Sequence, residues 1–588
     1  MLKTRKAIGF TGLILAMFMG ALDATIVNIA LPKIMTSFNT GLTDTTWVAT
    51  IYVLSMAVFM ITASKIADIY GRKIIMLIGC LLFGAFSFAC MTATSLSLLI
   101  LYRFIQGIGG AILTPIVLPM GIELFGKNST SRVAATIGAF SALAAAGGPA
   151  LGGFILNWSS WRWIFGINVP ISIIAFLAII LGTKESYDHT ISKKIDWIGM
   201  LLLTITMGGL TFGLLEGHQY GWSSPIIIGS FTAFILGLLL FIAVELKVDS
   251  PIIPLNLFKE ATFTTSSIVY LIFGFAIIGP SLILNYFLQN VRNYSALHSA
   301  YLIIPASLAI SISMPIATKM YHKLGAKLLI GIGLVISSGG LFMMAIINTG
   351  TPTANIVACN LIIGVGLGFT AISLAASVKF LPLSKNGIGS GVVNAARYVG
   401  QCLGMAILVT LLNANVNTAK NNIRHTAYNQ IRVSVLSNHV KQVIHEEVGK
   451  TLKTSKDTKN VTSDQSKLKA KIKSAATDTK GLPDPKPKTS YAALYSANKK
   501  LSTGSQKLLN IQQLQTVLKP MIIGQNQMGV AIKLLAQKQQ LTEVLNKVKH
   551  TKNHQLSLAF DNVFFVNGLV VLLCTPLAYW TDKKRKHR

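Results

Sequence analysis

The sequence predicts an all-α, polytopic membrane protein with fourteen transmembrane helices. The chain of 588 residues is 52% hydrophobic and only 12% charged, whereas a soluble domain carries about 25% charged residues. It contains fourteen apolar segments long enough to cross a bilayer, for which a helix needs about 20 residues. Lysine and arginine are concentrated in alternate connections between these segments, as expected of loops on the cytoplasmic side.

Short loops join the predicted spans, except before the last one. The spans are residues 7–31, 46–64, 74–93, 96–122, 132–156, 161–182, 196–216, 223–245, 263–288, 298–318, 326–347, 354–378, 388–412 and 558–580. With the N-terminus in the cytoplasm, that side holds 23 Lys and Arg, and the short loops of the other side hold only Lys33, Arg162 and Arg292. Because the number of spans is even, both termini are predicted to be cytoplasmic.

Residues 413–557, between the last two spans, form a large basic insertion. It holds 24 Lys and Arg against 7 Asp and Glu, and by parity it is extracellular, since long loops translocate regardless of charge. Residues 418–453 are predicted to be helical, and residues 454–489 to be a disordered linker. Residues 490–550 repeat apolar positions every seven residues, which predicts a helical, coiled-coil-like hairpin. These positions are Leu494, Ala497, Leu501, Gly504, Leu508, Ile511 and Leu518 and, after Pro520 and Gly524, Leu534, Leu541 and Val548.

The net charge of +32 does not indicate nucleic-acid binding, because the positive charges lie in the cytoplasmic loops and in this insertion. Two interpretations of the insertion's charge stay open: a solvated surface, or contact with anionic lipid headgroups or wall polymers. The five cysteines all lie in apolar segments and suit packing, so we predict no disulfide and no metal site.

Asp23 lies inside the first predicted span. The basic start and apolar run imitate a signal peptide, but the run is long and lacks a small-residue cleavage pattern, so we expect an uncleaved helix. An ionisable residue inside a membrane helix is costly and is therefore a candidate functional residue. The alternative is a structural carboxylate that pairs within the helix bundle. Asn28 points about 140° away on an ideal helix, so one of the two can face a cavity while the other ties the helix to a neighbour.

Arg103 in the fourth span needs a partner or a wet cavity, because it too is charged inside the bilayer. Gln106, Gly107 and Gly110 lie on its face at helical spacings, and the glycines leave room for the guanidinium. Arg103 is then either a functional arginine or a structural one that is bonded to backbone carbonyls.

The loop after the second span reads Ser64-Lys65-Ile66-Ala67-Asp68-Ile69-Tyr70-Gly71-Arg72-Lys73. Gly71 permits a tight turn. Asp68 can cap the third helix or pair with Arg72 or Lys73. Such a loop can lock two helices together and release them when its pairing changes.

The fifth span contains Gly147-Gly148-Pro149-Ala150-Leu151-Gly152-Gly153. Pro149 cannot donate a hydrogen bond to the carbonyl of Ala145, so the helix is expected to bend. Gly148 and Gly152 have the small-xxx-small spacing that lets a neighbouring helix come close. We therefore expect a kinked, tightly packed helix that can seal one face of the bundle.

These motifs, in this order, resemble those of the major facilitator superfamily, and in particular its fourteen-helix drug:proton antiporters. The loop is similar to the family signature G-x-L-A-D-R-x-G-R-K, from which it departs at Ser64, Ile66 and Ile69. The first-span motif L-D-x-T-I-V-N-x-A-L-P matches that of the subfamily throughout, and G-P-x-x-G-G in the fifth span resembles a signature of the family's exporters. A weaker echo of the loop, from Ala317 to Lys327, is what an internal duplication would leave.

The resemblance implies a major facilitator fold. This fold has two six-helix bundles with a site between them near the midplane, here with two extra central helices. The expected domains are the N-terminal bundle (1–182), two linker helices (183–262), helices nine to thirteen (263–412), the extracellular insertion (413–557) and the last helix with a basic cytoplasmic tail (558–588).

The resemblance further implies a proton-coupled exporter of lipophilic drugs or other amphipathic small molecules, with protons and membrane lipids as partners and no cofactor. Asp23 would carry the proton, and Arg103 would tune or relay it. Conformational roles are expected for Asp68, Gly71, Arg72, Lys73, Gly148, Pro149, Gly152 and Gly153. Substrate contacts are expected for Asn28, Gln106, Asn285, Gln289, Asn394 and Arg397.

A second hypothesis is a lipid or lipid-linked precursor flippase, or an envelope-assembly factor, whose basic outer loop contacts the wall. A non-transporting sensor is disfavoured by the intact Asp23, Arg103 and Pro149. An enzyme is disfavoured because the aqueous segments show no nucleophile–base set, phosphate-binding loop or metal cluster. The Lys-, Asn- and Ile-rich composition suggests a low-GC, Gram-positive bacterium, with the protein as a multi-pass component of its cell membrane.

Overall fold

The computed structural model describes residues 2–126, 129–187, 194–381, 386–451, 471, 474–479, 481–509 and 515–582. Within these residues every long regular element is a helix, and fourteen helices are long and apolar enough to cross a membrane. The all-α class and the number of spans are therefore confirmed. Several basic residues used for the orientation (Lys127, Lys193, Lys385 and the tail Lys583 to Arg588), and most of the linker expected at 454–489, lie outside the described residues.

The chain forms two compact units. The membrane unit comprises Met1–Ala414 and Phe560–Arg588, and the hairpin unit comprises Asn415–Ala559. Helices α14 (Asn386–Val433) and α18 (Gln515–Leu573) contribute residues to both. Both helices run well beyond the apolar stretches predicted for them, because Ala, Gln and Lys have good helix propensity and continue a helix where the apolar run stops.

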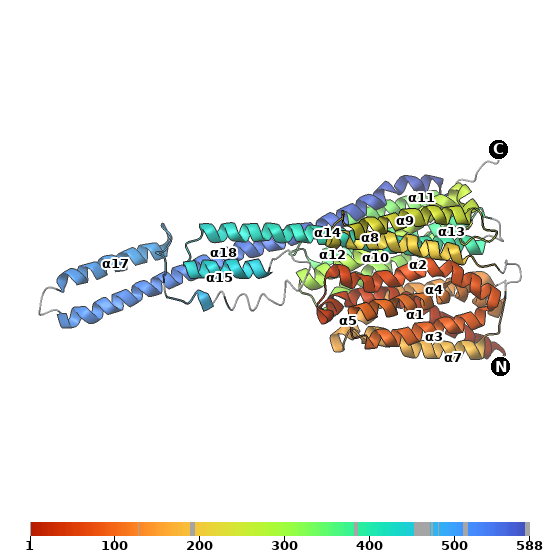
Figure 1. The fold of residues 1–588 in the computed structure, drawn as a ribbon, viewed down its shortest axis with the longest axis horizontal. Coiled ribbons are helices and arrows are strands. Elements are labelled where there is room, and N and C mark those ends of the chain that lie inside the picture. Colours follow the sequence, from red (N-terminus) through yellow and green to blue (C-terminus); the bar gives the residue numbers. More distant parts are fainter. Residues whose placement is uncertain are drawn as a thin grey trace. The chain divides into compact units, whose positions relative to one another are not determined.

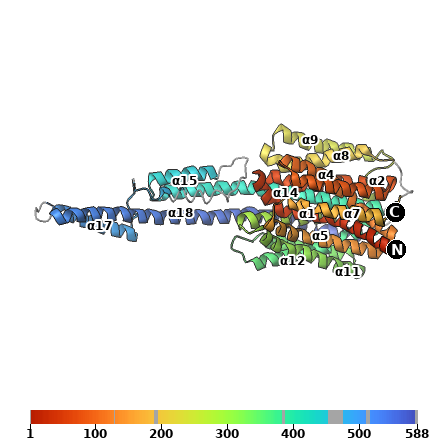
Figure 2. The same cartoon turned by 90° about the horizontal axis from the view of Figure 1, so that it is seen from below.

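In the membrane unit, the first seven helices form one bundle (Figure 1). They are α1 (Leu2–Phe38), α2 (Leu42–Tyr70), α3 (Arg72–Thr92), α4 (Leu96–Phe125), α5 (Thr130–Trp158), α6 (Trp163–Gly166) and α7 (Asn168–Gly182). α1 packs against α2, α4, α5 and α7, so its middle is almost entirely buried. We call the end of the membrane unit at which α1 begins the terminal end, and the end at which α1 finishes the loop end. The start of α1 and the end of the described chain, after α18, lie at the terminal end (Figures 1 and 2).

The second bundle is built from the later helices. They are α10 (Ala261–Tyr286), which continues into the π-helical turn η3 (Phe287–Val291), then α11 (Ala296–Met344), α12 (Thr353–Thr370), α13 (Ser373–Val378), the first part of α14, and the last part of α18 followed by the 3₁₀ turn η6 (Thr575–Trp580). α11 holds two of the predicted spans. The chain turns between them at Gly325, where φ is 74°.

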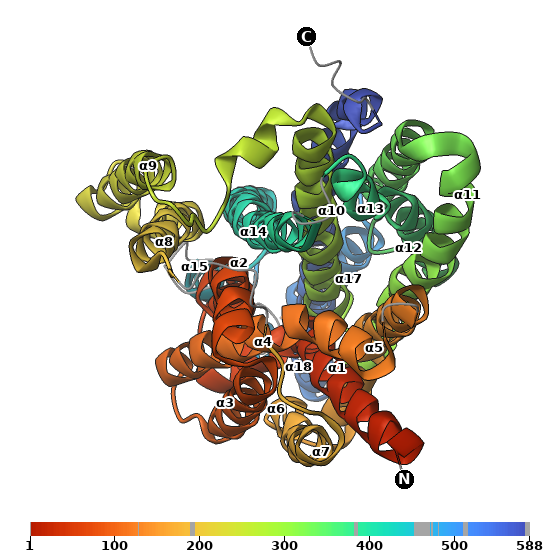
Figure 3. The ribbon, with the colours of Figure 1, turned by 90° about the vertical axis from the view of Figure 1, so that its right-hand side faces the viewer.

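Helices α8 (Trp197–Tyr220) and α9 (Pro225–Glu245) pair beside the two bundles, next to α2 and α14 (Figure 3). The indole Nε1 of Trp47 in α2 donates to Glu216 Oε1 of α8 at 2.8 Å. The hydroxyl of Thr410 in α14 donates to the carbonyl of Leu214 in α8 at 2.6 Å. α8 is therefore bonded to one helix of each bundle.

At the terminal end, a carboxylate from a later part of the chain caps α3. Gly71, at φ 118°, separates α2 from α3, and a Cβ there would lie 2.7 Å from Glu185 Cδ. Glu185, which follows α7, accepts the backbone N–H groups of Lys73 at 2.8 Å and Ile74 at 3.1 Å. The first N–H groups of a helix have no partner within the helix, so an acceptor there stabilises it.

The second bundle repeats this construction. Gly325 lies between its two spans at positive φ, and Asp582, which follows the last helix, accepts the N–H of Ala326 at 3.2 Å. Lys379 also donates to Asp582, at 2.5 Å. In both bundles, therefore, a carboxylate after the final helix caps the helix that follows the glycine turn. The weak echo between Ala317 and Lys327 in the sequence marks this structural repeat.

In the hairpin unit, α17 (Ser490–Leu508) lies antiparallel to the first part of α18, while α15 (Asn438–Thr451) lies beside α14 (Figures 1 and 2). Hydrogen bonds join α17 and α18: Asn498 Nδ2 donates to the carbonyl of Gln525 at 2.8 Å, and Gln525 Nε2 donates to Ser505 Oγ at 3.3 Å. Of the leucines expected to form a coiled-coil seam, Leu494, Leu501 and Leu508 are exposed, whereas Leu518 and Leu541 are buried and Leu534 is half-buried. Periodicity identifies an apolar stripe, but it does not say which neighbour covers it.

We expect Glu185→Ala and Asp582→Ala each to lower the free energy of unfolding by about 1 kcal/mol, the usual effect of removing a helix cap. Thermal unfolding of the purified protein in detergent measures this. Asp249→Ala is the control, because Asp249 forms only a solvent-exposed ion pair with Lys194 and such pairs contribute little. A control as destabilising as the two cap variants would contradict the assignment of the caps.

Candidate functional site

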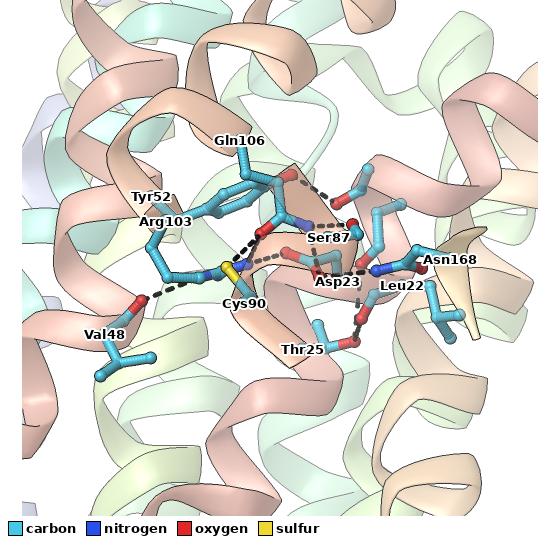
Figure 4. Close-up of polar contacts among 12 residues, drawn as sticks. Leu22, Asp23, Thr25, Val48, Tyr52, Ser87, Cys90, Arg103, Gln106 and Asn168 are labelled. Carbon is cyan, nitrogen blue, oxygen red and sulfur yellow. Dashed lines mark hydrogen bonds and ion pairs between the residues drawn. The ribbon is translucent and has the colours of Figure 1, made fainter. Parts of the chain in front are cut away.

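A fully buried carboxylate and a fully buried guanidinium pair inside the first bundle (Figure 4). Arg103 Nη1 of α4 donates to Asp23 Oδ2 of α1 in an ion pair. Asp23 Oδ1 accepts a second hydrogen bond from Asn168 Nδ2 of α7 at 2.9 Å and a third from Gln106 Nε2 of α4 at 3.2 Å. Two buried charges are stable only when their remaining hydrogen-bonding capacity is also used, and these amides use it.

Arg103 also has contacts that do not depend on Asp23. Its Nε donates to the carbonyl of Val48 at 3.0 Å, and its Nη1 donates to Gln106 Oε1 at 2.7 Å. The guanidinium lies 4.2 Å from the centre of the Tyr52 ring, within the range of a cation–π interaction. Arg103 therefore combines both predicted arrangements, a charged partner and a backbone carbonyl, and it keeps several partners if Asp23 becomes neutral.

Gln106 extends the network to α3. Its Nε2 also donates to Ser87 Oγ at 2.6 Å, and Cys90 Sγ lies 3.7 Å from its Oε1. Gln106 is a predicted substrate contact, and the structure places it fully buried beside Asp23. Its two ends bridge the carboxylate and the guanidinium, so any rearrangement of the pair must also move Gln106.

Sequence reasoning missed three members of this network: Asn168, Ser87 and Tyr52. A signal existed for Asn168, which is the one amide side chain in the apolar segment 161–182. Ser87 and Tyr52 carry no comparable signal, because serine and tyrosine are common in membrane helices. Their roles follow from which helices become neighbours.

Three predicted substrate residues form a contact between the bundles. Asn285 Nδ2 of α10 donates to the carbonyl of Asn28 at 2.7 Å, and Gln289 Nε2 donates to the carbonyl of Ile29 at 3.0 Å. Gln289 also donates to Asn285 Oδ1 at 2.8 Å. The side chain of Asn28 is buried, and its Oδ1 has no partner. Asp23 lies in the ion-pair network, whereas the tie of Asn28 to α10 uses its backbone carbonyl rather than its side chain.

A pocket of about 370 Å³ opens at the loop end between α1, α5 and the start of α11. Its lining is mostly polar and comprises Pro32, Lys33, Thr36, Leu156, Asn157, Gln289, Asn290, Tyr294, Ser295 and Ala296. Gln289 thus lines this pocket, and its amide also holds α1.

The glycines of α5 lie at two helix contacts. A Cβ on Gly152 would lie 3.0 Å from Ile26 Cγ1 of α1, and one on Gly148 would lie 3.1 Å from the backbone nitrogen of Ile26. A Cβ on Gly153 would lie 2.8 Å from that of Ala300 in α11. Pro149 is buried within the same helix. The motif therefore holds α5 against α1 and also against the second bundle.

Asn394 and Arg397 lie on α14, and their recorded contacts are separate from the Asp23 network. Asn394 Nδ2 donates to the carbonyl of Ser390 at 3.0 Å. The guanidinium of Arg397 lies 4.5 Å from the ring centre of Tyr398 and 6.0 Å from that of Tyr270. The structure therefore does not gather all the predicted substrate residues into one site.

The loop between α2 and α3 carries an ion-pair cluster. Arg72 Nε donates to Asp68 Oδ1 at 2.8 Å, and Arg72 also pairs with Glu123 of α4. Lys73 Nζ donates to the carbonyls of Ile180 at 2.8 Å and Thr183 at 3.0 Å. Of the two roles open to Asp68, the structure shows pairing, since Glu185 caps α3. The loop joins α2, α3, α4 and α7 at the terminal end.

Residues 13–405 match the Major Facilitator Superfamily. The chain belongs to this superfamily. As a major facilitator it is a membrane transporter rather than an enzyme. The matched residues include Asp23, Arg103 and the α5 glycines, and they end before the hairpin unit.

This major facilitator has curated relatives of similar length. It is 31% identical over 424 residues to the multidrug transporter protein MdtP of Bacillus subtilis. The aligned region covers 72% of this chain and 77% of the relative. It is 33% identical over 404 residues to the multidrug resistance protein Stp of Mycobacterium tuberculosis, over 68% of this chain and 74% of the relative. These relatives confirm the predicted resemblance to the multidrug efflux branch of the superfamily.

A solved structure shows the same fold. A POT family transporter in complex with a thioalcohol-conjugated peptide matches with a TM-score of 0.52 at 14% identity, over 70% of this chain and 90% of that one.

We expect Asn168→Leu to lower the free energy of unfolding by about 2 kcal/mol, because it removes a hydrogen bond to a charged, buried carboxylate. Ser172→Ala on the same helix is the matched control, since Ser172 Oγ donates to the neutral carbonyl of Cys80 at 2.9 Å, a bond worth about 1 kcal/mol. Thermal unfolding of both variants in detergent compares the two bonds. Equal losses would show that Asp23 is not held as a charged group.

Proposed function

We propose that this major facilitator exports lipophilic or amphipathic small molecules across the cell membrane in exchange for protons, and that Asp23 carries the proton. The observation that carries this proposal is the buried pair of Asp23 and Arg103. A buried ion pair adds little to the stability of a protein, because burying the two charges costs much of the free energy that their attraction returns. Stability alone therefore gives no strong reason for this pair. The names of the relatives, multidrug transporter and multidrug resistance protein, support the substrate class.

Protonation of Asp23 changes the forces between α1 and α4. A proton on Oδ2 removes the charge attraction to Arg103, while Arg103 keeps the Val48 carbonyl, Gln106 Oε1 and the Tyr52 ring. α1 is then freer to move relative to α4. The same helix, one turn beyond Asp23, supplies the carbonyls of Asn28 and Ile29 that bond to α10. Proton binding thus acts on the helix that contacts the second bundle.

The distribution of Lys and Arg supports a cytoplasmic terminal end. The contacts of α1 with α10 and of α5 with α11 then lie toward the outside and separate the centre of the membrane unit from that side. Transport requires that these contacts open when Asp23 receives a proton from outside. One charge crossing 100 mV releases about 2.3 kcal/mol, which exceeds the roughly 1.4 kcal/mol needed for a tenfold gradient of a neutral substrate.

We expect Asp23→Asn to abolish uncoupler-sensitive efflux of ethidium from energised cells, because an amide side chain cannot take up and release the proton that a carboxylate carries. Dye fluorescence in cells with wild type, variant and empty vector measures the efflux. The single variant leaves Arg103 without a charged partner, and breaking a buried ion pair costs about 3–5 kcal/mol of stability. Membrane expression is therefore quantified in parallel.

The double variant Asp23→Asn/Arg103→Gln separates coupling from stability. It removes the unpaired charge, and we expect it to restore expression without restoring efflux. Uncoupler-sensitive efflux in either variant would refute the role of Asp23 while leaving the exporter proposal intact. A well-expressed wild type that moves no dye would count against the exporter proposal itself.

The second candidate function is a lipid or lipid-linked precursor flippase, or an envelope-assembly factor. It is favoured by the compact hairpin unit, whose segment 413–557 holds 24 basic and 7 acidic residues. The two candidates differ in whether transport of small molecules needs this unit.

Deletion of residues 423–554 distinguishes them. Asn422 Nδ2 lies 3.0 Å from Gln555 Oε1, so a short Gly/Ser bridge can rejoin α14 and α18. We expect the shortened protein to keep ethidium efflux, because Asp23, Arg103 and the α5 glycines lie in the membrane unit. Unchanged dye efflux in this variant together with a cell-envelope defect would support a separate envelope role. Loss of efflux at normal expression would contradict our expectation.

A further inference from the structure

The hairpin unit exposes an apolar stripe on α17. Leu494, Leu501 and Leu508 are between 47% and 62% exposed. Ala497 and Gly504 lie between them, so that the stripe has the alternating three- and four-residue spacing of a coiled-coil seam. A Cβ placed on Gly504 would meet no atom within 4 Å, so this part of the stripe is open.

α18 exposes a second stripe with the same spacing. Val517, Met521, Met528 and Leu535 are between 49% and 66% exposed. Gly524 and Ala531 fill the positions between them, and a Cβ on Gly524 would also meet nothing within 4 Å. Large and small residues therefore alternate along both stripes.

Both stripes lie on one face of the hairpin. On each helix, the stripe is rotated by about 100° about the helix axis from the residues that contact the other helix, such as Asn498 and Gln525. The direction of this rotation is the same on both helices. Two antiparallel helices are related by a two-fold axis perpendicular to the plane that contains them. Positions offset in the same sense therefore emerge on the same side of the pair. We call this surface, formed by the large and small residues of both stripes, the leucine face.

The exposed apolar area of the leucine face is close to the area that a protein–protein interface buries. Its seven large side chains expose roughly 700 Å² of apolar surface, close to the roughly 800 Å² that each partner buries in a standard protein–protein interface. A contiguous apolar patch of this size is at or above the largest found on a typical monomer. Some partner is therefore expected to cover it.

Half of the lysines of the hairpin point away from the leucine face. Residues 490–542 contain lysines but no Asp or Glu. Three of these lysines, Lys499, Lys519 and Lys533, project about 160–180° from the leucine face on ideal helices. The other three, Lys500, Lys507 and Lys538, lie about 60–100° from it, at its edges. An anionic lipid surface or an acidic helix that bound the leucine face would meet only the three lysines at its edges. If two leucine faces met, Lys499, Lys519 and Lys533 would not oppose one another.

In the part of the chain that the structure describes, the seven large residues of the leucine face stay exposed. The segment 452–470, which lies outside the described residues, has only Leu452, Val461, Leu468 and Ala470 as apolar members. A surface of the same size and the same alternation of large and small residues is found on a second copy of the chain. There, the leucines of one copy can fit against the Ala and Gly positions of the other.

We propose that the leucine face of α17 and α18 binds the leucine face of a second copy, so that the transporter dimerises through its hairpin units. The contact is isologous: each copy contributes the same residues, and Lys499, Lys519 and Lys533 of both copies point away from it. It does not depend on the transport activity proposed above, and the test below does not use transport as a readout.

Cysteine cross-linking of the full-length protein tests this. Ala497→Cys places a thiol on the leucine face, and Gln506→Cys is the matched control, exposed on the same helix but about 160° around it. Of the native cysteines, four are buried and Cys574 is half-buried, so the unsubstituted chain gives the background. The proteins are reconstituted in liposomes at a low protein-to-lipid ratio and oxidised with copper–phenanthroline.

We expect a disulfide-linked dimer several-fold more abundant for Ala497→Cys than for Gln506→Cys. Leu501→Lys added to Ala497→Cys should abolish the dimer, whereas Thr503→Lys, on the other side of α17, should not. Equal cross-linking at both cysteines, no cross-linking at either, or a dimer that persists with Leu501→Lys would overturn the proposal. So would a product in native membranes whose mass corresponds to a different partner protein.

Discussion

The burial of one carboxylate and one guanidinium in the same membrane bundle constrains most of the first half of this protein. Neither Asp23 nor Arg103 is exposed, and each would be strongly unfavourable without the other. Donors and acceptors must therefore come from several helices: Gln106 from α4, Asn168 from α7 and the Val48 carbonyl from α2. The close packing of α1 within the bundle brings these groups together at one point.

The same helix connects this charge to the second bundle. α1 holds Asp23 in its middle, and one turn further on its carbonyls accept the amides of Asn285 and Gln289. α5 forms a parallel connection, since Gly148 and Gly152 pack against α1 while Gly153 packs against α11. A change in the charge of one side chain can thus reach the contact between bundles through rigid helices, without a chain of intermediate side chains.

The same local arrangement stabilises one end of each bundle. In each, a glycine with positive φ makes a turn, and a carboxylate from the end of the bundle caps the next helix: Glu185 in the first and Asp582 in the second. The hairpin unit follows a different rule. Where α17 meets α18, polar side chains form hydrogen bonds, and Leu494, Leu501 and Leu508 of α17 lie outside, whereas an ordinary two-helix coiled coil buries such leucines.

The sequence alone determined the class of fold, the number of spans and the positions of Asp23, Arg103 and the glycine motifs. A bilayer requires long apolar runs and makes any charge within them conspicuous, so these features can be read locally. Only the tertiary structure decided which groups meet. Asn168 and Gln106 lie 145 and 83 residues from Asp23, and Glu185 caps a helix that begins more than 100 residues earlier. It also decided that Leu501 faces outward. Periodicity describes one helix at a time, whereas these contacts depend on which helices become neighbours and how each is rotated.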